Sequence, residues 1–99
     1  MRRSDPSASL DEAELVGHRA LLFVAENPAR LERLLAETGI EPAELTARAG
    51  EHDTLVAVLG HILSDESMLL VFAAEAGIDP AQVQRACRLL AGEKPREPT

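Results

Sequence analysis

Residues 39–42 read Gly-Ile-Glu-Pro, residues 77–80 read Gly-Ile-Asp-Pro, and an alanine follows each. Glycine readily takes the left-handed conformation just after a helix, and a neighbouring isoleucine packs back onto the last turn. Aspartate, and less well glutamate, caps the helix that comes next, while proline suits its first position. The phrase therefore predicts a tight corner between two helices, made twice.

The composition favours helices throughout. The 99 residues suit one domain, 45% of them are hydrophobic, and the only aromatic residues are Phe23 and Phe72. The core must therefore be mostly aliphatic, and alanine and leucine are among the best helix formers. No run alternates apolar and polar residues as a half-buried strand does. We expect an all-α fold, a compact bundle of five to six helices.

The net charge limits the classes of molecule that the protein is expected to bind. The chain has a net charge of −7, and residues 9–91 hold 14 acids against six arginines, a net charge of −8. Such a field repels phosphate backbones and anionic membrane surfaces and favours basic or neutral partners. Cys87 is the only cysteine in the sequence, and no signal peptide is visible at the N-terminus. No apolar run approaches the length of about 20 residues that a membrane-spanning helix needs. We expect a cytoplasmic protein with no membrane association.

Helix-start signals divide the chain into segments. Residues 1–8 and 92–99 are polar and contain prolines, which predicts two disordered tails around a single helical domain, residues 9–91. Ser9 to Glu12 matches a capping box, which predicts a first helix from about Leu10 to Glu26. Asp53 is a candidate cap for the fourth helix. The first, fourth and fifth helices are the most apolar, so we expect them at the centre.

The two corners also define a repeat. At an offset of 38 residues, residues 27–49 align with 65–87 without gaps, and the two corners differ only by Glu41 against Asp79. This predicts two three-helix units, residues 10–50 and 51–91, related by pseudo-twofold symmetry. Shared corner chemistry without duplication would produce a similar pattern.

The two copies differ most on the helix that precedes the corner. Three polar positions in the first copy become apolar in the second: Arg30, Glu32 and Arg33 align with Met68, Leu70 and Val71. Either this second helix is buried in the core, or it presents an apolar face to a protein partner or to a second copy of the chain. Met68, Leu70 and Val71 are therefore the candidate interface.

The sequence contains no catalytic, metal-binding or cofactor-binding signature. His18 follows Glu14 by four residues, which is typical of a helix-surface pair, and a buried histidine with its hydrogen bonds satisfied is the other interpretation. Asp65 follows His61 by four residues, but a helix end falls between them, so we interpret His61 as a histidine near a helix C-terminus. His52 lies in a predicted loop, and Cys87 lies in an apolar stripe, as a small core residue does. No metalloprotease, paired-cysteine, dinucleotide-binding or phosphate-loop motif occurs. We expect no enzyme and no cofactor.

One alternative is nucleic-acid binding. The segment Ala36–Gly50 resembles a helix-turn-helix, whose second helix enters the major groove. That second helix would offer Glu44, Thr46 and Arg48, and the last helix of the chain offers Gln82, Gln84, Arg85 and Arg88. The strongly acidic domain argues against this alternative.

Residues 23–45 and 59–80, which hold both corners and the helices before them, resemble a bacterial family of small proteins called domain of unknown function 3572. The resemblance covers about residues 11–90. It implies a cytoplasmic helical domain and carries over no functional residue. With the charge and the apolar exchange, we expect a non-enzymatic protein-interaction or regulatory module, with helix-turn-helix-like nucleic-acid binding as the alternative.

Overall fold

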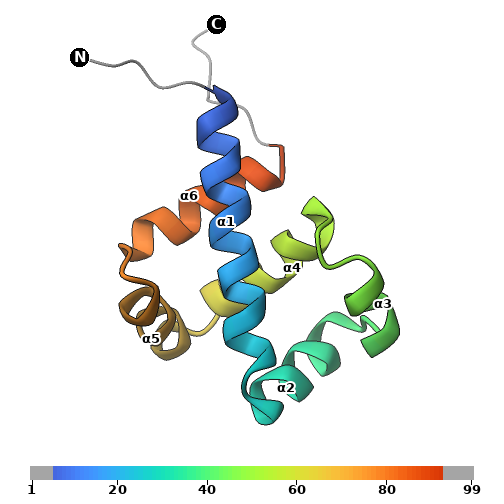
Figure 1. Cartoon of the computed structure of the whole chain (residues 1–99). Helices are drawn as coiled ribbons and strands as arrows, with labels where there is room; N and C mark the ends of the chain where they lie inside the picture. Colours follow the sequence, from blue (N-terminus) through green and yellow to red (C-terminus); the bar gives the residue numbers. More distant parts are fainter. Residues whose placement is uncertain (1–5, 93–99) are drawn as a thin grey trace, which may run out of the picture.

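The computed structural model describes residues 6–92. Within that range it contains helices alone: α1 (Pro6–Ala25), α2 (Pro28–Thr38), α3 (Pro42–Ala47), α4 (His52–Leu63), α5 (Glu66–Ala76) and α6 (Pro80–Leu90) (Figure 1). The predicted all-α bundle is confirmed.

Both corners form as predicted. Gly39 and Gly77 follow α2 and α5 in the left-handed conformation, with φ of 76° and 71°. Asp79 accepts a hydrogen bond from the Ala81 amide at 2.8 Å, and its own amide donates to the Gln82 side chain. Glu41, its counterpart in the first corner, makes no side-chain cap. The difference follows from the longer side chain of glutamate, which caps poorly.

One predicted helix start and one predicted cap are wrong. Helix α1 begins at Pro6, so Ser9 lies inside it and no capping box forms there; the chain gains one more helical turn than predicted. Glu51 rather than Asp53 precedes α4, and Asp53 lies in its first turn, where it meets the helix dipole instead. The predicted N-terminal tail, residues 1–8, is therefore too long. Residues 1–5 and 93–99 lie outside the described residues.

The helices at the centre are α1, α4 and α6. Each of them packs against the other two, and α1 crosses in front of α4 and α6 (Figure 1). The prediction that α5 is central is wrong: α5 lies at the periphery and packs mainly against α4. The apolar composition of α5 is misleading because only one side of this helix is buried. Helix α6 reaches the centre with a narrow stripe, Val83, Ala86 and Leu90.

The 38-residue repeat has a structural counterpart in four helices. Helices α2 and α5 have bounds that differ by 38 residues, and α1 and α4 end 38 residues apart. Gly17 lies against Leu55, and Glu14 bonds to His52, so both contacts join a residue to its own counterpart. Such contacts lie on a twofold axis. The symmetry fails at the third helix, because α6 packs across α1 and α4 whereas the shorter α3 packs weakly on the rest.

Candidate functional site

Among the described residues, the large apolar side chains that the fold leaves exposed lie on two helices. Leu15 and Leu22 of α1 are 53% and 62% exposed, and Leu70 and Val71 of α5 are 53% and 42% exposed. Met68, the third residue of the predicted interface, is only 8% exposed and belongs to the core. Met68 points inward because it shares the buried side of α5 with Phe72, four residues on. Of the three apolar residues that distinguish α5 from α2, one thus belongs to the core and two lie on the surface.

Sequence reasoning missed the two leucines of α1. Leu15 and Leu22 are seven residues apart, so they lie on one side of the helix, two turns apart. Helices α4 and α6 pack on α1, and the exposure of both leucines places them on a side of α1 that these helices do not cover. The helical positions of Arg19 and Glu26 on the same side as Leu22 could have revealed this outer face. We call the outer faces of α1 and α5, with Leu15, Leu22, Leu70 and Val71, the α1–α5 surface.

A groove of about 240 Å³ runs between the two helices of this surface. Its lining comes from the second half of α1 and the end of α5: Arg19, Leu22, Phe23, Glu26, Phe72, Glu75 and Ala76. Val71 lies one helical turn before Glu75, on the same flank. Of the exposed aliphatic side chains, Leu22 thus lines the groove and Val71 lies on its flank.

The floor of the groove is aromatic and firmly held. The rings of Phe23 and Phe72 lie 5.3 Å apart at an angle of 55°, a favourable tilted arrangement. The guanidinium of Arg30 lies 3.9 Å from the centre of the Phe23 ring and donates to the Phe23 carbonyl oxygen at 3.4 Å. Across the groove, Arg19 Nη1 donates to the carbonyl oxygen of Ala76 at 3.3 Å, which ties α1 to the end of α5. The groove is thus largely preformed.

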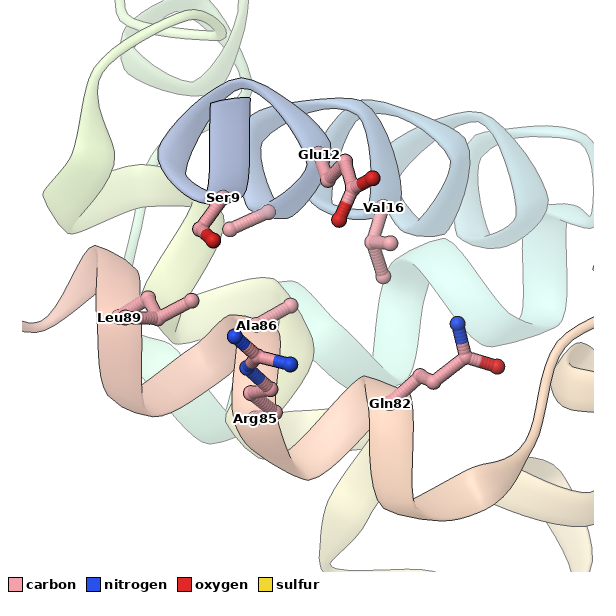
Figure 2. Close-up of a pocket in the computed structure, with 8 residues that line it drawn as sticks. Ser9, Glu12, Val16, Gln82, Arg85, Ala86 and Leu89 are labelled. Carbon is pink, nitrogen blue, oxygen red and sulfur yellow. The ribbon is translucent and has the colours of Figure 1, made fainter. Parts of the chain in front are cut away.

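A second, smaller cleft of about 50 Å³ lies between α1 and α6. Figure 2 shows Ser9, Glu12 and Val16 of α1 opposite α6, with Gln82 and Leu89 on the facing helix. This volume holds one or two water molecules, since each occupies about 30 Å³ in the liquid. The Gln82 side chain is already engaged in the cap of α6. The cleft is too small to bind an organic ligand as it stands.

Two histidine–glutamate pairs link helices that are distant in sequence. His52 Nε2 lies 2.7 Å from a carboxylate oxygen of Glu14, so the α4 start is tied to α1. His61 Nδ1 lies 2.7 Å from a carboxylate oxygen of Glu37, which ties α4 to α2. The His61 side chain is 2% exposed, and its Nε2 is buried without a hydrogen-bond partner among the described residues. Glu14 therefore pairs with His52 rather than with His18, and His61, in the last turn of α4, pairs with Glu37 rather than with Asp65.

The helix-turn-helix segment exposes few groups suited to DNA. Its second helix, α3, has six residues, with Glu44 in the first turn. Arg48, just after α3, lies 3.8 Å from a carboxylate oxygen of Glu51. The basic groups that a recognition helix would present are thus few and partly neutralised.

The arrangement of residues 6–92 bears on two further kinds of function, metal binding and membrane insertion. No group of three or more histidine, cysteine, aspartate or glutamate residues in that range is placed to hold a metal ion. No single helix there is long and apolar enough to cross a membrane; α4 and α5 meet that test only when taken together, and they are bent by 114° at their junction.

The fold and the surface together define a small, acidic, all-α protein with a preformed groove between two peripheral helix faces. A family model described as "Protein of unknown function (DUF3572)" matches residues 10–93, and the chain belongs to that family. Comparisons with curated proteins and with solved structures gave no match. The resemblance seen in the corners is confirmed across nearly the whole chain.

Proposed function

We propose that this protein is a non-enzymatic interaction module that binds a helical segment of another protein on the α1–α5 surface. The observation that supports this most is a preformed groove between two helices, with the exposed Leu22 in its lining and the exposed Val71 on its flank. A groove between two helices is the shape that an amphipathic helix fills with its apolar face.

The charge of the chain favours a different protein over a second copy of this chain. Residues 9–91 have a net charge of −8, and Glu26 and Glu75 both line the groove. Two copies that met across this surface would place these like charges near one another, which costs free energy. A partner with basic groups at the edge of its apolar face would instead be attracted.

The placement of the histidines supports a non-catalytic role. A general acid or base must reach the proton that it transfers. His52 and His61 pair with glutamates that link helices, and the second nitrogen of His61 is buried. The acidic surface and the short α3 likewise favour a protein partner over nucleic acid.

Photo-crosslinking in the native cell tests the proposal. A photoreactive amino acid at position 22 or 71 should form an adduct with a discrete protein, whereas one at the exposed Ala47 of α3 should not. With the recombinant partner, Leu22→Asp should weaken binding by about ten-fold or more, because a carboxylate would have to be buried in an apolar contact.

Two results would contradict the proposal. One is an equal crosslinking pattern at positions 22, 71 and 47. The other is a partner that binds the Leu22→Asp variant as tightly as the native protein. A sedimenting dimer that Leu22→Asp dissociates would assign the surface to a second copy.

A further inference from the structure

The pseudo-twofold symmetry relates the contact between α1 and α5, where the groove lies, to the contact between α4 and α2. At an offset of 38 residues, Phe23 of α1 corresponds to His61 of α4, and Glu75 of α5 corresponds to Glu37 of α2. The contact between α1 and α5 is thus the counterpart of the contact between α4 and α2.

At the α2–α4 contact, the glutamate has a partner within the chain. Glu37 Oε1 lies 2.7 Å from His61 Nδ1, and a carboxylate only accepts, so the imidazole donates the hydrogen bond. Glu37 remains 54% exposed while His61 is buried beneath it. The Glu37 carboxylate is thus satisfied by a group of the same chain.

At the α1–α5 contact, the equivalent residue, Glu75, has no side-chain partner among residues 6–92. Phe23 has no polar hydrogen to donate, and Phe23 and Glu75 both line the open groove. Among the described residues Glu75 forms no hydrogen bond through its side chain and no ion pair, and the same holds for Glu26 on the opposite wall. The one cation among the described residues of the lining, Arg19, is bonded to the Ala76 carbonyl oxygen.

We propose that Glu75 selects a lysine or arginine side chain of the bound helix. The inference depends on the proposed function, since it names the chemistry of the partner at the same surface. The aliphatic stem of the partner's basic residue lies against Leu22, the exposed apolar side chain of the lining, and its cation meets the Glu75 carboxylate. The partner is thus an amphipathic helix with a basic residue beside its apolar stripe.

A phage-displayed library of amphipathic helical peptides tests this selection. The native protein should enrich peptides with a lysine or arginine at one position next to the apolar stripe. The Glu75→Arg variant should lose this preference and enrich an acidic residue there. Glu32→Arg, which reverses an exposed charge on α2, is the matched control and should keep the native preference. The selected basic peptide should bind Glu75→Arg at least about five-fold more weakly than the control.

The outcomes separate the two proposals. Peptides that need Leu22 and Val71 but show no basic preference would overturn the role of Glu75 and leave the interaction surface standing. Peptides whose binding is indifferent to Leu22→Asp and Val71→Asp, or a library that yields no binder, would overturn both. Equal loss in Glu75→Arg and Glu32→Arg would show a general charge effect and would also overturn the role of Glu75. Denaturation midpoints of both variants establish that they fold.

Discussion

The close approach of α1 and α4 predicts opposite effects of the same substitution at two glycines. Gly17 is buried where α1 meets α4, and an added Cβ would lie 3.1 Å from both Cβ and Cδ1 of Leu55. Gly60, near the end of α4, has no atom within 4 Å of an added Cβ. Neither glycine has a positive φ, so alanine suits both backbones.

The two energies that compete at Gly17 can be compared. Replacing a glycine by alanine inside a helix stabilises it by about 1 kcal/mol. Overpacking a core by one carbon costs about 1–3 kcal/mol, and the Cβ of a fully buried Leu55 cannot move without its backbone. Gly17→Ala should therefore lower the free energy of unfolding by about 1 kcal/mol. Gly60→Ala should raise it by about 0.5–1 kcal/mol, because only the helix propensity applies.

Urea denaturation followed by circular dichroism measures both variants. A change of about 1 kcal/mol corresponds to a shift of about 4–8 °C in Tm for a domain of this size, so thermal unfolding serves as a second readout. If Gly17→Ala stabilised the protein as much as Gly60→Ala, α1 and α4 would not approach as closely as described. The pseudo-twofold contact at Gly17 and Leu55 would then be wrong.

Three further predictions concern the corners and the groove. Gly77→Ala should cost about 1–2 kcal/mol of stability in urea titrations, because its φ of 71° strains any residue with a Cβ although space is free. Asn27→Ala should lower the free energy of unfolding by about 1 kcal/mol, since two amides of α2 lose their acceptor. Asp53→Ala should change it by less than about 0.5 kcal/mol, because Asp53 makes no cap. Leu22→Asp should leave the free energy of unfolding within about 0.5 kcal/mol of the native value, because Leu22 is exposed. Phe72→Ala should lower it by about 3–5 kcal/mol, because Phe72 is buried in the core. A large loss for Leu22→Asp would mean that this leucine is buried.

The local features could be read from the sequence because their causes are local. A left-handed glycine, a cap and a proline act within a few residues, so Gly39, Gly77 and Asp79 were predictable. The start of α1 was not, because Ser9 matches a capping box equally well inside a longer helix.

The order of the helices in space depends on long-range packing. The apolar residues of α5 suggested a central helix, yet Leu70 and Val71 are exposed while α6, with fewer apolar residues, lies at the centre. The partners of Glu14 and Glu37 were also hidden, because His52 and His61 are 38 and 24 residues away. Only the alignment of the two copies pointed to α5 as unusual, and one of the three apolar residues behind that signal proved to be a core methionine.

The footprint of a bound partner tests the central proposal most directly. Amide chemical shifts of the labelled protein, followed as the crosslinked partner's helix is added, should change at Leu22, Phe23, Val71 and Glu75 and remain unchanged along α3. A footprint confined to α3, or to the exposed side of α6, would contradict the assignment of the α1–α5 surface as the binding site.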